Sequence, residues 1–313
     1  MGSAFVKLLI KRAAYPLVID KLTYAGDLSR LKDVKGEFTF YKADICNQSQ
    51  IDKIFAKEKP EIVVHFAAES HVDRSLNKAA PFIETNIKGT LALIDICRKH
   101  NIRRFVFIST DEVYGEVLKG SSKESSIFKP SSPYAASKAA ADLLVQSYIR
   151  SYKFPAIIVR PSNNYGPWQY PEKLIPLAIL KIIEGGKVPL YGKGRNIRQW
   201  LYVDDCAEGI LAAVNKGVTG QAYNLGSKYE SSNIKTIRLL LKVLGIKQNR
   251  LEFVKDRPGH DIRYSLDYSK AYKDLKWYSG VEFIRGLKYT AAWSLENREW
   301  IKSKSGEINK LYR

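Results

Sequence analysis

The chain has 313 residues, of which 45% are hydrophobic and 27% are charged, as in ordinary soluble globular proteins. This length suits about two domains, and no apolar run approaches the roughly 18 residues that cross a bilayer. Cys46, Cys97 and Cys206 are far apart and form no CxxC pair, which argues against a disulfide framework or a zinc knuckle. The first residues carry their cations after the apolar stretch, unlike a signal peptide, so we expect a cytoplasmic protein.

The formal net charge of +19 suggests an anionic partner. The cations are scattered along the chain, in segments such as "RKHNIRR" and "IKSKSGEINK", and no tract is long and purely basic. This distribution favours a generally cationic surface over a nucleic-acid footprint. Part of the charge could serve an anionic small-molecule substrate.

Helical and strand patterns alternate from the start of the chain to about residue 165. In chain order, we expect a helix over 3–12, strands over 17–20 and 38–45, a helix over 48–58, a strand over 61–70, a long helix over 79–100, a strand over 104–110, a second long helix over 132–152 and a strand over 155–163. Strands that alternate with helices predict an α/β fold with a Rossmann-like, doubly wound parallel sheet.

The amino-acid composition changes after residue 166, where proline, glycine and aromatic residues become frequent. A helix over 202–217 and a strand over 222–226 are expected to return to the first domain, and a mixed, loop-rich segment follows. We therefore expect one domain from 1–166 plus about 200–225. A smaller, mixed C-terminal domain would comprise about 167–199 plus 226–313.

The segment "FVFISTDEVYGE" ends an apolar strand with Thr110 and two adjacent carboxylates, Asp111 and Glu112. Ligands of open α/β sheets bind at the carboxyl ends of the strands. A single carboxylate in this place more often caps a turn, so the interpretation depends on what else converges there.

Tyr134 and Lys138 lie four residues apart in "SPYAASKAAADLL", and therefore on one face of the expected helix. Ser132 and Pro133 predict a capped helix start. A lysine ammonium beside a tyrosine favours the phenolate, so we expect a lowered pKa and a phenol that can deprotonate an alcohol. By itself the YxxxK spacing is a weak signal, because it occurs by chance on many surface helices.

Thr110 with the Tyr134–Lys138 pair resembles the catalytic set of the extended short-chain dehydrogenase/reductases. Seven further segments, in the same order along nearly the whole chain, resemble the dTDP-glucose 4,6-dehydratase family. They are "DKLTYAGDL", "HFAAESHVDRS", "STDEVYGE", "SPYAASKAAAD", "RPSNNYGPWQYPEKLIP", "LYGKGRNIRQWLYVDD" and "DRPGHDIRYSLD". The first domain is then expected to bind NAD and the second the nucleotide sugar.

The resemblance implies a dehydration that borrows a hydride from the sugar. Tyr134, with Lys138 and Thr110, would deprotonate the C4 hydroxyl while C4 transfers hydride to tightly bound NAD. Glu112 would remove the C5 proton as base, and Asp111 would protonate the departing C6 hydroxyl as acid. Return of the hydride to C6 would give a 4-keto-6-deoxy sugar. Elimination needs both proton transfers, which explains two carboxylates at one strand end.

The same resemblance implies the binding residues. Asp20 would accept hydrogen bonds from the adenosine ribose, which favours NAD over NADP. The expected cofactor contacts are Gly2, Asp20, Lys21, Leu22, Thr23, Asp44, Ile45, Phe66, Ala67, Ala68, Thr85, Tyr134, Lys138 and Asn164. The expected nucleotide-sugar contacts are Ser70, Thr110, Asn163, Lys173, Leu174, Pro189, Tyr191, Arg198, Asn233, Arg257, His260 and Tyr264. Asp44 could instead cap a helix, and Arg198 or Arg257 could form a surface ion pair rather than a diphosphate clamp. We expect no metal site, because His71 and His260 lack suitably spaced carboxylates.

Two departures from the family pattern stand out. The family opens with a strand and a turn of the form GGAGFIGS, whereas this chain opens with "MGSAFV", which corresponds to the last glycine and serine of that turn. A doubly wound sheet without its first strand would have unpaired strand edges. Either the start is assigned too late or the chain is a truncated copy that cannot hold the dinucleotide normally. The second departure is Gln199, where the family usually has an acidic residue, and we expect an altered contact to Arg198.

Other readings remain open at this stage. The chain could be another nucleotide-sugar dehydratase, a 4-epimerase, or a non-catalytic relative that binds nucleotide sugars or RNA. By resemblance, we expect a homodimer in which the helices over 79–100 and 133–152 form a four-helix bundle with their symmetry mates, and no membrane partner.

Overall fold

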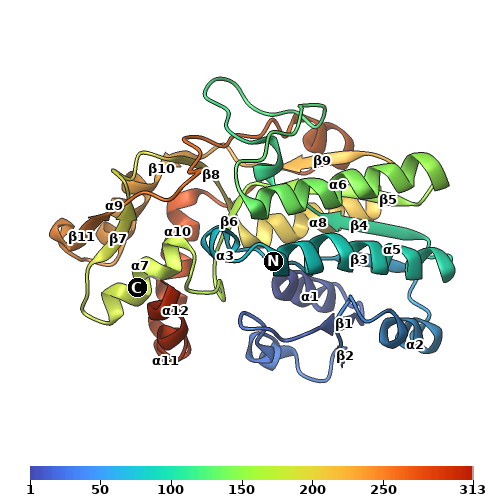
Figure 1. The fold of residues 1–313 in the computed structure, drawn as a ribbon. Helices are drawn as coiled ribbons and strands as arrows, with labels where there is room; N and C mark the ends of the chain where they lie inside the picture. Colours follow the sequence, from blue (N-terminus) through green and yellow to red (C-terminus); the bar gives the residue numbers. More distant parts are fainter. Residues whose placement is uncertain (312–313) are drawn as a thin grey trace.

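The computed structural model describes residues 1–311 and is an α/β protein of the Rossmann-like class (Figure 1). The elements up to residue 165 are α1 (Gly2–Lys11), β1 (Leu17–Asp20), η1 (Leu28–Val34), β2 (Thr39–Lys42), α2 (Gln48–Glu58), β3 (Ile62–His65), α3 (Val72–Asn77), α4 (Ala80–Phe82), η2 (Ile83–Lys88), α5 (Gly89–Lys99), β4 (Arg104–Ile108), η3 (Asp111–Tyr114), α6 (Pro133–Tyr152), β5 (Ala156–Pro161) and β6 (Asn163–Tyr165). Among residues 1–311, no helix combines the length and the apolar character needed to cross a bilayer.

The remaining elements alternate between the two halves of the molecule seen in Figure 1. They are α7 (Leu174–Ile183), β7 (Val188–Tyr191), β8 (Ile197–Tyr202), α8 (Val203–Lys216), β9 (Ala222–Leu225), β10 (Glu230–Ser232), α9 (Asn233–Val243), η4 (Gln248–Arg250), β11 (Leu251–Val254), η5 (Ala271–Leu275), α10 (Phe283–Glu296), α11 (Arg298–Lys302) and α12 (Ser305–Leu311).

The central sheet has four parallel strands in the order β3-β4-β5-β9. Side chains of β4 alternate between two cores, because successive residues of a strand point to opposite faces. Phe105 and Phe107 pack with α2, α5 and α6, whereas Val106 and Ile108 pack with α1 and α8. Helices therefore cover both faces, which buries the strand that carries the candidate acids.

The predicted parallel sheet is divided into two parts in this structure. β1 and β2 form a separate parallel pair, and β1 is not hydrogen-bonded to β3. The side chains of 17–19 and 62–64 are only partly buried, whereas those of 105–108 and 156–161 are buried. This agrees with the expectation of unpaired strand edges in the first half of the chain.

Three further element predictions required correction. The strand expected over 61–70 ends at His65, and 66–70 is loop. The long helix over 79–100 contains the π-helical turn η2, which adds a residue to its middle. The segment after 226 is richer in helix than expected, since α9, α10, α11 and α12 all lie there. The apolar faces of these helices pack with α7, β7 and β8 in a second hydrophobic core.

Candidate active site

The turn after β4 holds the two carboxylates in place. Thr110 is the N-cap of η3, and its hydroxyl accepts a hydrogen bond from the Glu112 amide at 3.3 Å. The same hydroxyl lies 3.2 Å from Asp111 Oδ1. Gly115 ends the turn with a φ of 71°, and a Cβ there would clash with the Lys129 carbonyl. The sequence Thr-Asp-Glu thus becomes a compact acidic turn at the end of a buried strand.

Helix α6 brings a phenol and an amine to that strand end. Its start is capped as predicted, since Ser132 Oγ accepts from the Ala135 amide at 3.1 Å and Pro133 is the first helical residue. Lys138 Nζ donates to the Ile108 carbonyl at 2.6 Å, directly before the acidic turn. Lys138 and Tyr134 are both buried.

The expected activation of Tyr134 is not present in this structure. Burial raises the pKa of Tyr134, the charges of Glu112 and Asp111 raise this pKa further, and only the Thr110 hydroxyl opposes them. Burial also lowers the pKa of Lys138 to about 7, against the raising effect of Asp142. The predicted lowering of the Tyr134 pKa is therefore not found, because burial and the two carboxylates outweigh the groups that favour the phenolate.

Asp111 and Glu112 are in different electrostatic surroundings. Burial raises the pKa of Asp111 to about 7, and the charge of Glu112 adds to this rise. Burial also raises the pKa of Glu112, but Arg257, Lys173 and Arg198 oppose that shift. The pKa of both carboxyl groups is thus raised overall, and Glu112 has the larger number of nearby cations that favour its ionised form. The buried Asp111 Oδ2 has no hydrogen-bond partner within the described protein.

Arginine and tyrosine side chains surround Glu112 from the second half of the chain. Arg198 is buried and donates to the Asp261 carbonyl at 3.1 Å. Its guanidinium carbon lies 4.3 Å from the centroid of the Tyr264 ring. The Tyr264 hydroxyl donates to Asp261 Oδ2 at 2.6 Å. Arg198 forms no ion pair with a carboxylate among residues 1–311, which argues against the surface ion-pair alternative.

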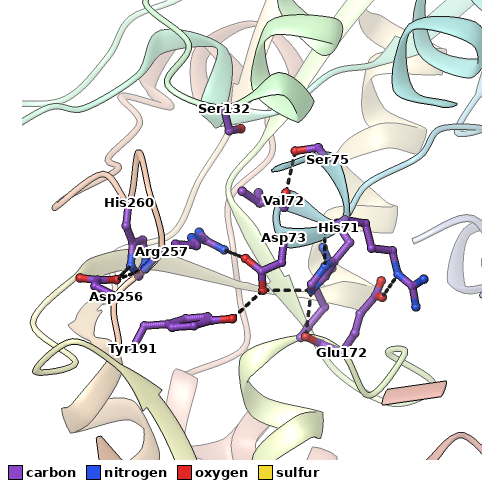
Figure 2. A network of polar contacts seen from close by, with 12 residues as sticks. His71, Val72, Asp73, Ser75, Ser132, Glu172, Tyr191, Asp256, Arg257 and His260 are labelled. Atoms are coloured by element: carbon purple, nitrogen blue, oxygen red, sulfur yellow. Dashed lines mark hydrogen bonds and ion pairs between the residues drawn. The ribbon is translucent and has the colours of Figure 1, made fainter. Parts of the chain in front are cut away.

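Arg257 lies in a second polar network, drawn in Figure 2. Its Nη1 donates to Asp73 Oδ1 at 3.1 Å, and the Tyr191 hydroxyl donates to Asp73 Oδ2 at 2.9 Å. His260 Nδ1 lies 2.6 Å from Asp256 Oδ1. Arg257 therefore forms an ion pair, but within a partly buried network and not on the open surface, so neither the surface-pair alternative nor the diphosphate clamp is decided by this contact.

Other expected nucleotide-sugar residues occupy the junction of the two halves. Lys173 Nζ donates to the Ser70 carbonyl at 2.6 Å and so joins the loop after β3 to the start of α7. Asn163 and Asn233 each have a buried side-chain oxygen without a hydrogen-bond partner in the described protein. Leu174 begins α7 and Pro189 lies in β7.

The expected adenosine-binding residues gather at the ends of β1 and β2. Asp20 ends β1, is exposed, and accepts from the Leu22 amide at 2.7 Å. Lys21 Nζ and Asp44 Oδ2 form an ion pair at 2.5 Å between the two strand ends. The alternative in which Asp44 caps α2 was wrong, because Asn47 is the N-cap. Asp44 accepts instead from the Cys46 amide at 3.0 Å.

The remaining expected cofactor residues lie around the N-terminus of α1 and the carboxyl ends of β3 and β5. Gly2 packs against the Phe66 side chain, so α1 begins beside the loop that contains Ala67 and Ala68. The remaining positions are Thr23 in the loop after β1, Ile45 packed near Gly89, Thr85 in η2 and Asn164 in β6. No hydrogen bond or ion pair joins these positions to Asp20 within residues 1–311.

The donor and acceptor set fits a dinucleotide. Asn164 Oδ1, Ser162 Oγ and Ser109 Oγ are buried without hydrogen-bond partners in the described protein, and they lie at the ends of β4, β5 and β6. Buried polar atoms without partners are uncommon and call for a ligand or water. The exposed Asp20 carboxylate at the end of β1 can accept from ribose hydroxyls.

Comparisons with known proteins agree with this geometry. The family model described as GDP-mannose 4,6 dehydratase matches residues 1–290. The dTDP-glucose 4,6-dehydratase of Neisseria meningitidis serogroup B is 43% identical over 96% of this chain and 92% of its own length. The chain belongs to the dTDP-glucose 4,6-dehydratase family. The dTDP-glucose 4,6-dehydratase of Salmonella typhimurium is 42% identical over 98% of this chain and 93% of its own length.

Solved structures of the dTDP-glucose 4,6-dehydratase family have the same fold. The enzyme of Streptomyces venezuelae, solved with NAD and dTDP bound, is 41% identical and has a TM-score of 0.94 over 97% of this chain and 96% of its own. The Bacillus anthracis enzyme in complex with NAD is 36% identical with a TM-score of 0.90. A UDP-glucose 4-epimerase from Thermotoga maritima is 29% identical with a TM-score of 0.89, so the fold alone does not distinguish the two reactions.

The acidic partners of the dehydratase-family site were missed at the sequence level. Asp73 and Asp261 both lie within segments that carried the resemblance, yet nothing in their spacing marked them as partners of Tyr191 or Tyr264. Gln199 makes no side-chain hydrogen bond with Arg198 among residues 1–311, in keeping with the expectation of an altered contact. Gln199 Nε2 donates to the Leu266 carbonyl at 3.2 Å, and Gln199 Oε1 accepts from the Leu266 amide at 3.4 Å.

Proposed function

We propose that this chain dehydrates dTDP-glucose to dTDP-4-keto-6-deoxyglucose, as a lyase with NAD as its cofactor. The supporting observation is the buried Asp111 carboxyl, whose Oδ2 has no partner in the described protein and whose pKa is raised to about 7 by burial and by Glu112. Such a group can hold a proton near neutral pH and donate it to a departing hydroxyl. An epimerisation at C4 needs no such acid.

The residues then divide the proton transfers. Tyr134 takes the proton of the C4 hydroxyl, and Thr110 holds that hydroxyl by a hydrogen bond. Glu112, near three cations that favour its ionised form, takes the proton at C5. Asp111 gives its proton to the C6 oxygen, which leaves as water. Proton removal at C5 and proton donation at C6 concern adjacent carbons, which suits two adjacent side chains on one turn.

When bound, NAD would accept the hydride from C4 and give it to C6. Glu112 would return a proton to C5 as the hydride reaches C6, which completes the 4-keto-6-deoxy sugar. For this chain we infer that Asp20, Lys21, Leu22, Thr23, Asp44, Ile45, Gly2, Phe66, Ala67, Ala68, Thr85 and Asn164 hold the cofactor. Asp20 would select NAD over NADP, because a 2′-phosphate would meet its carboxylate.

The nucleotide sugar is held by groups from both halves of the molecule. Arg198, Arg257 and Lys173 supply the positive charge that a diphosphate requires, since all three act electrostatically on Glu112 and so lie around one space. Ser70, Asn163, Leu174, Pro189, Tyr191, Asn233, His260 and Tyr264 complete the proposed contacts. The proposed domains are 1–166 plus about 200–225 for NAD, and about 167–199 plus 226–313 for the nucleotide sugar.

The experiment is to incubate the purified protein with NAD⁺ and dTDP-glucose and to analyse the sugar nucleotide by mass spectrometry. We expect a product lighter by one water that absorbs in alkali as a 4-keto sugar does. A product of unchanged mass would indicate an epimerase. UDP-glucose in a parallel reaction tests the base, and we expect it to be a poorer substrate.

We also propose a homodimer through α5 and α6. Leu143 is 54% exposed in the middle of α6, and Ile83 is 44% exposed just before α5 in sequence. Two such helices from each protomer would bury these side chains in a four-helix bundle. Light scattering during gel filtration should give twice the mass of one chain, and Leu143→Lys should shift the protein toward the monomer. A monomeric parent protein would contradict the proposal.

A further inference from the structure

Asp73 joins the two halves of the molecule at the proposed diphosphate site. It lies in α3, and its side chain is only 13% exposed. Tyr191, at the end of β7, donates to Oδ2 at 2.9 Å, and Arg257, in the loop after β11, donates to Oδ1 at 3.1 Å. Figure 2 shows both side chains converging on this carboxylate from separate segments.

Arg257 is the principal cationic partner of Asp73. His71 Nε2 is 4.0 Å from Asp73 Oδ2, but burial and the nearby Lys173 charge lower the pKa of His71 to about 4, which leaves it neutral near pH 7. Burial by itself would raise the pKa of Asp73, but the Arg257 charge, His71 and the hydrogen bonds of Tyr191 and Arg257 lower it overall. Asp73 is thus an anion at neutral pH.

The contact with Asp73 fixes the plane of the Arg257 guanidinium. A guanidinium is rigid and planar, so holding Nη1 also sets the direction of the other nitrogens. Arg257 Nε is buried and has no hydrogen-bond partner in the described protein. The arginine is therefore oriented with one donor engaged by Asp73 and another still available to an acceptor.

We propose that Asp73 is a positioning residue for the nucleotide sugar, which holds Arg257 and Tyr191 in the orientation that receives the diphosphate. This inference rests on the proposed function. Asp73 does not touch the reacting carbons, so its loss should weaken nucleotide binding and raise KM more than it lowers kcat. Charge repulsion alone predicts the opposite, namely tighter nucleotide binding without Asp73, because a carboxylate repels a diphosphate. Weaker nucleotide binding after the loss of Asp73 would indicate positioning, and tighter binding would indicate repulsion.

The experiment is calorimetric titration of dTDP into the full chain loaded with NAD⁺, for the parent protein, Asp73→Asn, Arg257→Gln and the double variant. Asn keeps the shape of Asp but loses the charge that holds Arg257. We expect Asp73→Asn to bind dTDP about tenfold more weakly, which is the scale of one charge-assisted contact. In the Arg257→Gln background the same change should have almost no effect, because Asn keeps an oxygen that can accept from the Tyr191 hydroxyl and no arginine is left to position.

Asp52→Asn is the matched control, since the Asp52 carboxylate also contacts two side chains, Lys99 and His100, in another part of the protein. It should leave dTDP affinity unchanged. Equal or tighter dTDP binding by Asp73→Asn would overturn the inference, and so would a tenfold loss that persists without Arg257. Should Asp73→Asn fail to fold, Asp73→Glu makes the same test, since the longer side chain displaces the carboxylate. A parent protein that binds no dTDP would overturn the proposed function itself and this inference with it.

Discussion

Arg160 and Asp142 form a bidentate ion pair in the core, with Nε–Oδ2 and Nη2–Oδ1 distances of 2.9 and 2.8 Å. The two side chains are 2% and 0% exposed. Arg160 also donates from Nη1 to the Tyr114 hydroxyl at 2.7 Å. The pair therefore ties α6, which carries Tyr134 and Lys138, to the end of the turn that carries Asp111 and Glu112.

Replacing Asp142 with Ala should destabilise the protein strongly. The change leaves Arg160 buried without its counter-charge, which typically costs about 3–5 kcal/mol. Urea unfolding followed by circular dichroism measures the free energy of unfolding. Asp52→Ala, which removes an exposed ion pair, should cost less than about 1 kcal/mol. If Asp142→Ala lowered the free energy of unfolding as little as Asp52→Ala does, the buried pair would not stabilise the site.

Water loss from the sugar should depend on pH through Asp111. Burial and Glu112 raise its pKa to about 7, and the acid acts only while it is protonated. Rapid-quench measurements of water loss in a single turnover should therefore show a rate that falls as the pH rises through about 7. In Asp111→Asn the residual rate should lack this fall. A rate that increases steadily over about three pH units around that pKa would exclude Asp111 as the acid.

Tyr134→Phe should abolish the first proton transfer and with it all product formation. General-base catalysis contributes on the order of 10²–10⁴ in rate, so we expect a loss of at least that size in kcat. Tyr148→Phe is the matched control on the same helix, because the Tyr148 hydroxyl donates to Asp95 Oδ1 at 3.1 Å near the far end of α6. Similar losses in both variants would show that the effect is structural and not chemical.

Asp27 should stabilise the packing of the C-terminal helices on η1. It accepts from Trp300 Nε1 at 2.7 Å and from Lys304 Nζ at 2.9 Å. Although burial opposes the shift, hydrogen bonds from Ser29, Trp300 and Lys304 lower the Asp27 pKa. A lowered pKa in the folded state means that the stabilisation is present above the unfolded pKa, about 4, and is lost as the pH falls below it.

Asp27→Asn should accordingly lower the free energy of unfolding by about 1–3 kcal/mol at pH 7. The difference from the parent protein should shrink as the pH drops below about 4. Thermal unfolding at several pH values measures this. A difference that grows in acid would contradict the assigned sign.

The local elements of the first half could be predicted because each depends on its own residues. The apolar run 105–108 and the Ser132–Pro133 cap specify β4 and α6 without help from the rest of the chain. The division of the sheet could not be read in this way, because the alternating pattern predicts strands but not their hydrogen-bonded neighbours. The helices after 226 were missed because glycines near or within them, such as Gly245 and Gly286, interrupted the helical pattern.

The candidate site, too, could be predicted from the sequence only in part. Motif spacing placed Thr110, Asp111, Glu112, Tyr134 and Lys138 together, and the structure brings them to one strand end. The pKa of Tyr134 could not be predicted from its spacing to Lys138, because burial and the nearby carboxylates determine it. Asp73 was overlooked because its partners, Tyr191 and Arg257, are distant in the sequence.

The central claim is that Glu112 takes the C5 proton while Asp111 gives a proton to the C6 oxygen. Its most direct test is to incubate Glu112→Gln and Asp111→Asn with NAD⁺ and dTDP-glucose in D₂O and to locate deuterium in the recovered sugar by NMR. We expect Asp111→Asn to incorporate deuterium at C5 without losing water, because its base is intact. Glu112→Gln should incorporate none. Deuterium at C5 in Glu112→Gln, or its absence in Asp111→Asn alone, would contradict this division of roles.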